Sequence, residues 1–228
     1  MHRRARHLKG KAAGASFHFD ARFIDSTDGT AIQTWSDLAG TNDLTQSTSG
    51  YRPVYKTNIF NGNPIIRFDG TDDFYNLTTG VDIAGEFSAI IAYKQTNTNS
   101  PSFTFRTSVL GVPYTNYMFS GTMYTTTGAG TFSATSISTN TFQIITTYTN
   151  SGNTTIALYA NGVNAGGTNV VSSISGNLDC LGRRDWDTPD AYLAGDVGAA
   201  IHIRGSLGGT LRKRFEHAMA FSYKLACS

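Results

Sequence analysis

A series of different short motifs runs along almost the whole chain, and this series constrains the fold more than any single motif does. In chain order they are residues 19–21 (FDA), 34–40 (TWSDLAG), 52–55 (RPVY), 65–73 (IIRFDGTDD), 158–162 (LYANG), 181–184 (LGRR) and 193–196 (LAGD). Glycine, asparagine and aspartate, which favour turns, punctuate many of them. No unit of roughly 20 to 50 residues repeats, which argues against solenoids and propellers.

The composition indicates the same fold class. Charged residues make up only 15% of the chain, whereas helical proteins usually carry many lysines and glutamates on their exposed faces. The polar surface comes instead from threonine, serine and asparagine, and β-branched threonine suits a pleated strand. A single all-β domain can absorb the 228 residues.

Local patterns predict individual strands. Residues 16–20 alternate apolar and polar side chains, and the apolar run 87–93 predicts a buried central strand. Residues 195–204 predict a late strand with one apolar face. The residues expected on that face are Val197, Ala199, Ile201 and Ile203.

Turn residues predict the connections between strands. Asparagine–glycine pairs at 61–62 and 161–162 are typical of hairpin turns. Residues 142–148 and 154–159 flank a polar turn at 150–153 and predict a further hairpin.

One helix is predicted, at 210–225. Its apolar stripe, at spacings of three and four, consists of Leu211, Phe215, Ala218, Met219 and Ser222. Thr210 is a candidate N-cap. Arg212, Lys213 and Arg214 would then oppose the helix dipole in the first turn. Either the helix start faces an acidic neighbour, or these cations form a tolerated surface cluster.

Trp35 is interpreted as a buried anchor that packs a loop against a sheet, with Asp37 capping the turn beside it. Indole brings a large apolar area into a core, and its N–H usually finds one buried partner. Phe68 is likewise expected in the core, with Asp69 and Gly70 turning the chain after it.

In their order and spacing, the motifs resemble the laminin-G-like branch of the concanavalin A-like jelly rolls, over about residues 16 to 225. The resemblance implies an all-β fold: an antiparallel β-sandwich of jelly-roll topology with a short C-terminal helix. It also implies a non-catalytic module, because laminin-G-like domains mostly bind glycans or proteins.

Residues 1–14 are predicted to form a basic arm that precedes a jelly-roll domain at 15–228. The arm has no acidic residue, and its five cations are Arg3, Arg4, Arg6, Lys9 and Lys11. Such an arm can dock on an acidic partner. No apolar segment of the kind found in a signal peptide follows these cations, so the arm is not predicted to be a secretory signal. No apolar stretch is long enough to span a membrane, and the net charge of +2 argues against a nucleic-acid partner.

Asp69, Asp72 and Asp73 are close enough in sequence to gather oxygen ligands for calcium. Their spacing lacks the ligand pattern of an EF-hand loop, so turn capping is the favoured interpretation and structural calcium the alternative. A second acidic loop, with Asp185, Asp187 and Asp190, has the same two interpretations. No other cofactor is indicated.

Cys180 and Cys227 permit one disulfide but do not require it, and buried thiols are the favoured interpretation. No histidine and cysteine set has zinc spacing, and His18, His202 and His217 are interpreted as structural.

Catalysis is not expected. Glycoside hydrolysis needs two carboxylates on either side of a cleft. Only two glutamates occur, Glu86 and Glu216, and they are far apart in sequence. The sequence also lacks a Gly-x-Ser-x-Gly nucleophile motif and a glycine-rich phosphate loop.

Aromatic residues in loops rich in glycine, proline, asparagine and threonine are the candidate glycan-binding residues. They are Tyr114, Tyr117, Tyr124 and Trp186. Aromatic faces can stack on sugar rings, but tyrosines in strands also frequently face the core, and both interpretations stay open.

The basic arm and the missing secretory signal, together with the frequent use of the resembled family in phages, predict a structural or recognition subunit on the surface of a bacteriophage-type virion. The basic arm would dock it on other protein subunits, and synthesis would take place in a cytoplasm. A free lectin-like glycan-binding protein is the main alternative, and a glycoside hydrolase is a more distant one.

Overall fold

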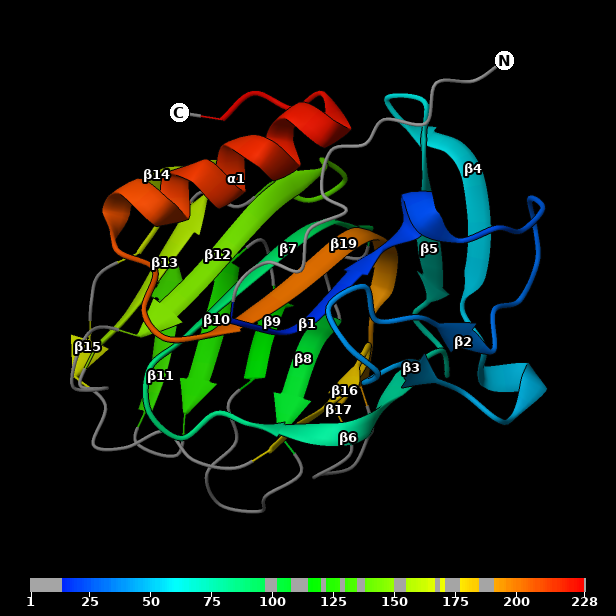
Figure 1. Ribbon diagram of the computed structural model, residues 1–228, viewed down its shortest axis with the longest axis horizontal. Helices are drawn as coiled ribbons and strands as arrows, with labels where there is room; N and C mark the ends of the chain where they lie inside the picture. Colours follow the sequence, from blue (N-terminus) through cyan, green and yellow to red (C-terminus); the bar gives the residue numbers. More distant parts are fainter. Residues whose placement is uncertain are drawn as a thin grey trace.

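The computed structural model describes residues 14–96, 102–107, 115–119, 122–127, 130–134, 138–149, 155–166, 169–170, 177–184 and 191–227. These residues form two facing antiparallel β-sheets and one C-terminal helix (Figure 1). The predicted all-β sandwich with a short C-terminal helix is confirmed. Within the described residues, no helix is long and apolar enough to cross a membrane.

The larger sheet has the strand order β14-β13-β12-β7-β19-β5-β4, with β1 paired to β19 and β15 to β13. Its strands are β1 (Ala15–Asp20), β4 (Val54–Phe60), β5 (Asn63–Asp69), β7 (Phe87–Gln95), β12 (Gln143–Thr149), β13 (Thr155–Ala160), β14 (Val163–Asn164), β15 (Asn169–Val170) and β19 (Ala194–Arg204).

The smaller sheet has the order β11-β10-β9-β8-β16-β6-β3-β2. Its strands are β2 (Thr34–Trp35), β3 (Leu44–Thr45), β6 (Tyr75–Asp82), β8 (Ser102–Thr107), β9 (Thr115–Phe119), β10 (Thr122–Thr127), β11 (Gly130–Ala134) and β16 (Asn177–Leu181). The remaining elements are the short pair β17 (Arg183–Arg184) and β18 (Ala191–Tyr192), the 3-10 turns η1 (Ala21–Phe23) and η2 (Ser49–Tyr51), and α1 (Gly209–Tyr223).

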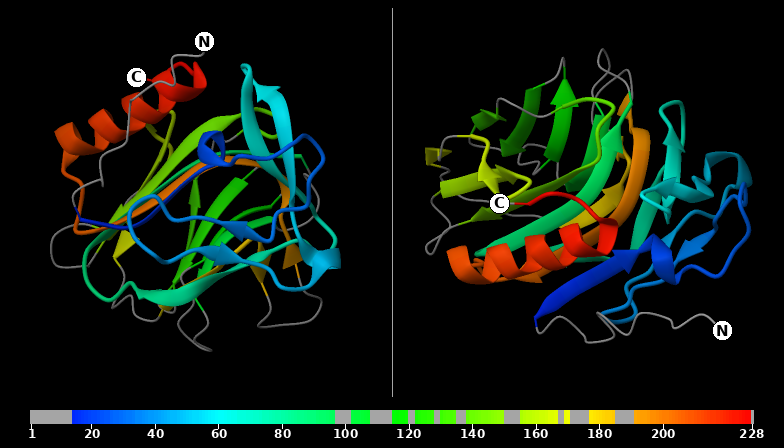
Figure 2. Two further views of the ribbon diagram at one scale, coloured as in Figure 1. Left: turned by 45° about the vertical axis from the view of Figure 1, so that its right-hand side comes forward. Right: turned by 90° about the horizontal axis from the view of Figure 1, so that it is seen from above.

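The larger sheet is covered on both faces. One face packs on the smaller sheet through a core that includes Phe19, Leu44 and Ile91. The other face packs under α1, where Ile90 and Met219 belong to a second core (Figures 1 and 2). Burial on both faces explains why β7 lacks the alternation of a half-exposed strand. The predicted buried central strand is confirmed, since β7 lies between β12 and β19.

The late strand β19 departs from its predicted pattern at one residue. Val197 belongs to the core between the sheets, whereas Ala199, Ile201 and Ile203 belong to the core under α1. The register with β7 shifts between Val197 and Ala199, so a bulge moves the side chains that follow it to the opposite face. Gly198 sits in this bulge because a Cβ there would lie 2.7 Å from the Tyr223 ring.

The predicted hairpin turns are confirmed. Asn61 and Gly62 between β4 and β5 have φ angles of 50° and 86°, and Asn161 and Gly162 between β13 and β14 have the same two values. Both central residues of these turns need positive φ, which asparagine and glycine tolerate best. The strands β12 and β13 pair antiparallel, as the hairpin prediction requires.

The helix differs from its prediction in its start and in its buried face. It begins at Gly209 with Gly208 as the N-cap, so the prediction of Thr210 as N-cap was wrong. Leu211, expected to be buried, is 46% exposed. The buried residues of α1 are Arg212, Glu216, Met219, Ala220 and Tyr223.

A buried ion pair explains the rotation of the helix. The Arg212 Nη1 atom lies 2.7 Å from Glu216 Oε1, and the Arg212 guanidinium lies 3.5 Å from the centroid of the Tyr159 ring. Apolar periodicity cannot predict such a pair, because arginine and glutamate are usually exposed and are therefore assigned to the outer face of a helix. Arg212 therefore does not belong to the predicted surface cluster.

The three histidines interpreted as structural occupy two kinds of position. His18 and His202 are buried in β1 and β19, whereas His217 is exposed on α1. The His202 ring stacks at 5.6 Å from that of Phe87, and burial lowers the pKa of His202 to about 3. His202 is thus a neutral core residue. Neither Cys180, which is buried, nor Cys227, which is half-buried, forms a disulfide.

Candidate functional site

Trp35 fixes the segment that connects β1 to β3. Its indole is 1% exposed and lies 5.7 Å from the Phe19 ring and 6.4 Å from the Tyr75 ring, centroid to centroid. The interpretation as a buried anchor is confirmed. The expected partner is missing, however: among the described residues, the indole N–H has no hydrogen-bond acceptor.

Asp37 holds the same segment through the backbone. Its Oδ1 atom accepts hydrogen bonds from the N–H groups of His18 and Ala39, both at 2.8 Å, and its Oδ2 atom accepts one from Asn42. Asp37 thus caps the turn as predicted, and it also ties that turn to β1.

A cavity of about 380 Å³ lies between η1, β2 and the loop that joins them. Ile32 and Trp35, both buried, form apolar parts of its lining, while Phe23 and Leu38 are each 37% exposed beside them. Side chains with hydroxyl, amide or carboxylate groups complete the lining. They include Asp25, Ser26, Thr30, Gln33, Thr34 and Ser36.

The two carboxylates of the cavity differ in their availability. Asp20 is 2% exposed and forms a salt bridge with Arg22, whose Nε atom lies 3.0 Å from Oδ1 and 3.1 Å from Oδ2. The Tyr223 hydroxyl donates a further hydrogen bond to Asp20 at 3.1 Å. Asp25 is exposed, and within the described residues it forms no ion pair. Among the described residues, no lysine or arginine belongs to the lining, although the Arg52 Nη2 atom donates a hydrogen bond to Gln33 Oε1 beside it at 3.1 Å.

This cavity was not predicted from the sequence. No periodicity in residues 24–34 indicates that they enclose a hollow. The available signal was weak: Phe23 and Leu38 are large apolar residues within a connection otherwise rich in serine, threonine and aspartate.

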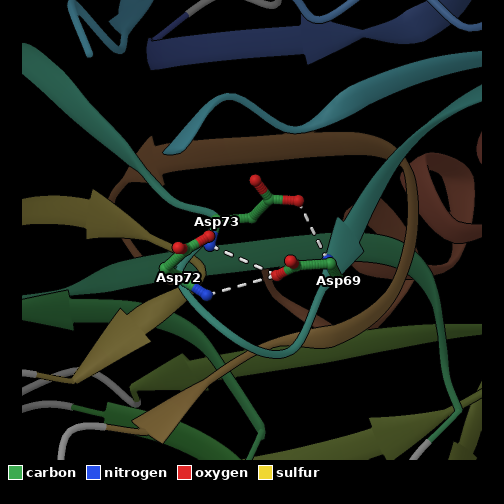
Figure 3. A group of neighbouring side chains, drawn as sticks. All are labelled: Asp69, Asp72 and Asp73. Carbon is green, nitrogen blue, oxygen red and sulfur yellow. Dashed lines mark hydrogen bonds between the residues drawn. The ribbon is translucent and has the colours of Figure 1, made fainter. Parts of the chain in front are cut away.

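The acidic residues at the end of β5 form a turn that is capped from within (Figure 3). The Asp69 Oδ1 atom accepts hydrogen bonds from the backbone N–H groups of Thr71, Asp72 and Asp73. The Asp73 Oδ2 atom accepts one from the Asp69 N–H at 3.0 Å. The favoured interpretation of turn capping is confirmed.

The same three carboxylates lie close together, as a cation site requires. One oxygen of each lies within 4.8 Å of the others, with Asp69 exposed, Asp72 half-buried and Asp73 buried. Burial, together with the negative charge of Asp69, raises the pKa of Asp73 to about 6. Calcium takes about 6 to 8 oxygen ligands, and Asp69 Oδ1 and Asp73 Oδ2 are already engaged with backbone N–H groups. The carboxylates alone therefore supply only part of a calcium site.

The other predicted site residues are brought together only in part. Tyr117 in β9 lies directly opposite Tyr124 in β10 in the strand register. Tyr114 and Trp186 lie outside the described residues, as does the second acidic loop. The five cations of the arm, Arg3, Arg4, Arg6, Lys9 and Lys11, also lie outside the described residues.

The two glutamates lie in different environments. Glu86 precedes β7 and accepts a hydrogen bond from the Ser206 N–H, and Glu216 is buried in its pair with Arg212. Each glutamate is thus engaged with its own neighbours.

No family model matches the chain, and no curated protein matches it. Solved structures do share its fold. A sialidase from Trypanosoma rangeli matches 92% of this chain with a TM-score of 0.64 at 10% identity. Domain 4 of AbnA, a GH43 extracellular arabinanase from Geobacillus stearothermophilus solved with arabinotriose, matches 86% with a TM-score of 0.61 at 14% identity. The binding domain of botulinum neurotoxin serotype D matches 90% with a TM-score of 0.59 at 12% identity.

These similarities cover different shares of the other proteins. This chain spans 33% of the sialidase chain and 51% of the toxin binding domain, but 95% of the arabinanase domain. At such identities the comparison shows the β-sandwich fold alone.

Proposed function

We propose that this protein is a non-catalytic recognition module that binds a neutral glycan in the cavity between η1 and β2. The observation that carries the proposal is the combination in one cavity of exposed apolar surface, from Phe23 and Leu38, with hydroxyl, amide and carboxylate groups.

The size and the chemistry of the cavity fit a sugar. Ligand sites typically have volumes of roughly 300 to 1,000 Å³, and the volume here is about 380 Å³. A sugar ring offers an apolar C–H face and several hydroxyls. The exposed part of the Phe23 ring can contact the C–H face, while Ser26, Thr34 and Ser36 provide hydroxyl partners.

The charge of the cavity favours a neutral sugar. Arg22 compensates Asp20, which leaves Asp25 as the uncompensated charge in the lining. A carboxylated sugar would bring a second negative charge close to Asp25, and the described lining residues include no lysine or arginine. Such like-charge proximity is unfavourable.

The lack of an available carboxylate pair supports a non-catalytic role. Asp20 is engaged by Arg22 and Tyr223, so Asp25 has no second free carboxylate beside it in the lining. Hydrolysis of a glycosidic bond ordinarily needs two.

One of the solved structures with a similar fold also supports the proposal of a neutral glycan as ligand. Domain 4 of the arabinanase was solved with arabinotriose, a neutral sugar, and this chain spans nearly all of that domain. The laminin-G-like resemblance in the sequence points to the same class of ligand.

The test is a calorimetric titration with arabinotriose and a panel of neutral oligosaccharides, with sialyllactose as the anionic comparison. We expect a neutral sugar to bind, and Phe23→Ala to weaken that binding about tenfold, the loss of roughly 1.4 kcal/mol. The matched control is Phe221→Ala, which removes an exposed ring on α1 far along the chain. Equal losses in the two variants, or no binding by any sugar, would contradict the proposal.

The narrower role as a virion subunit rests on the sequence of the arm. It predicts that deleting residues 1–14 abolishes incorporation into a particle while the sandwich stays folded. Co-sedimentation of the full-length and shortened proteins with particles from a producing cell measures this, and incorporation of the shortened protein would rule out docking by the arm.

A further inference from the structure

The outward face of α1 carries cations and an aromatic ring without any acidic residue. At about 100° per residue, one exposed stripe along the helix and its C-cap contains Lys213, Arg214, His217, Phe221 and Lys224. We call these five residues the basic face. Figures 1 and 2 show α1 on the outside of the molecule, away from the smaller sheet.

The basic face has no compensating charge among the described residues. Glu216 is the one acidic residue of α1, and it is buried against Arg212. In the described part of the chain, neither Lys213 nor Arg214 forms a salt bridge. The charges of Lys213 and Arg214 therefore face solvent on one side of α1, and Lys224, at the C-cap, adds a third charge whose Nζ atom donates a hydrogen bond to the Asn61 carbonyl at 3.1 Å.

The start of the helix adds to the positive potential. Gly208, the N-cap, provides no side-chain hydrogen bond, so the backbone N–H groups of the first turn have no cap. These groups carry partial positive charge. A shallow depression beside them is lined by Gly209, Thr210, Lys213, Arg214 and His217.

Phe221 gives the same face an apolar contact point. Its side chain is 80% exposed, the largest exposed fraction of any large hydrophobic residue in the described part of the chain. Aromatic and arginine residues are enriched among the side chains that dominate protein–protein binding energy. An exposed ring within a row of cations matches a partner surface with carboxylates around an apolar recess.

We propose that the basic face of α1 docks on an acidic protein surface. The occupant cannot be the arm of this chain, because residues 1–14 carry five cations and no acidic residue. A nucleic acid would use the cations but offers no recess for Phe221. A lipid surface needs a wider apolar band than one ring provides. This surface is separate from the cavity, so its role does not depend on glycan binding.

The test uses a fluorescein-labelled glutamate-rich peptide with a central pair of leucines, and fluorescence anisotropy as the readout. We expect binding that weakens with added salt. We expect the double variant Lys213→Glu/Arg214→Glu to weaken it about tenfold or more. Phe221→Ala should weaken binding of this peptide severalfold but leave binding of a plain glutamate peptide unchanged.

Arg204→Glu is the control for charge reversal away from α1, because Arg204 is exposed and ends β19, where its Nη2 atom lies 3.7 Å from Asp82 Oδ2. If Arg204→Glu weakened peptide binding as much as the double variant does, the binding would reflect general charge attraction, and the proposal would be overturned. Tighter binding to phosphatidylserine vesicles or to duplex DNA than to the peptide would also overturn it. Thermal unfolding of every variant checks folding. The exposed positions on α1 predict unchanged Tm values, whereas Arg204→Glu should lower Tm slightly because it places a second carboxylate beside Asp82.

Discussion

The turn at Asp69 and the cavity at Trp35 contain similar polar residues, but these residues have different partners in the two regions. In the turn, the carboxylates of Asp69 and Asp73 accept hydrogen bonds from backbone N–H groups of the turn itself. In the cavity, Asp25 and Ser36 are exposed and line an open hollow. The turn resembles a ligand site in sequence, whereas the cavity resembles an ordinary connection.

A cluster of acidic residues therefore indicates a ligand site only once its hydrogen-bond partners are known. A carboxylate that caps a turn has fewer oxygens available for a ligand. Exposed polar groups beside exposed apolar surface are the stronger indication of binding. The predictions below separate the two regions, since changes in the turn should alter stability and changes in the cavity should alter binding.

The largest effect is expected for Asp69→Ala. The substitution leaves three backbone N–H groups of the turn without their acceptor. We expect the free energy of unfolding to fall by about 2 kcal/mol, with sugar affinity unchanged. Urea denaturation measures this. Asp72→Ala is the control, expected to cost less than about 0.5 kcal/mol; similar losses for both would mean that Asp69 does not cap the turn.

Asp73→Asn should change how stability depends on pH. The folded pKa of Asp73, about 6, lies above its ordinary value of 3.8, so the folded protein holds this proton more tightly than the unfolded chain. As pH rises from about 4 to 6, wild type should lose stability through this group. Asparagine cannot ionise, so the variant should lose roughly 1 kcal/mol less over that window. Thermal unfolding across pH measures the difference, and parallel curves would contradict it.

A smaller effect is expected for Ser36→Ala in the cavity. Losing one hydroxyl partner should weaken binding of a neutral sugar about threefold and leave Tm unchanged, because Ser36 is exposed. Calorimetry with the best oligosaccharide of the panel measures it. Ser49→Ala, in η2 and outside the cavity lining, is the control and should bind like wild type.

Calcium should have the smallest effect. If the turn is complete without a cation, millimolar calcium should raise Tm by less than about 1 °C. A rise of several degrees that Asp72→Ala abolishes would instead establish the alternative interpretation, in which the three carboxylates hold the ion.

Features encoded by local chemistry could be predicted from the sequence. The turns at Asn61 and Asn161 require positive φ, and Trp35 requires a core because of its size. Features that depend on tertiary packing could not. The bulge at Gly198 moves Val197 to the other face of β19, and the pair of Arg212 with Glu216 rotates α1.

The candidate site was less predictable than the fold. The capping role of Asp69 follows from its spacing to the next three residues, but the cavity depends on how η1, β2 and the loop between them are placed around it. No period or motif records that arrangement. The aromatic candidates Tyr117 and Tyr124 are opposite one another in the register of β9 and β10, and their role in glycan binding stays a prediction.

The most direct test of the central claim is a map of chemical-shift changes in isotope-labelled protein during titration with a neutral oligosaccharide. If the cavity binds the sugar, amide signals from residues 20–38 should shift in a saturable manner, while those of residues 69–73 should not. Changes centred on residues 69–73, or on the β9–β10 pair with none at 20–38, would contradict binding in the cavity.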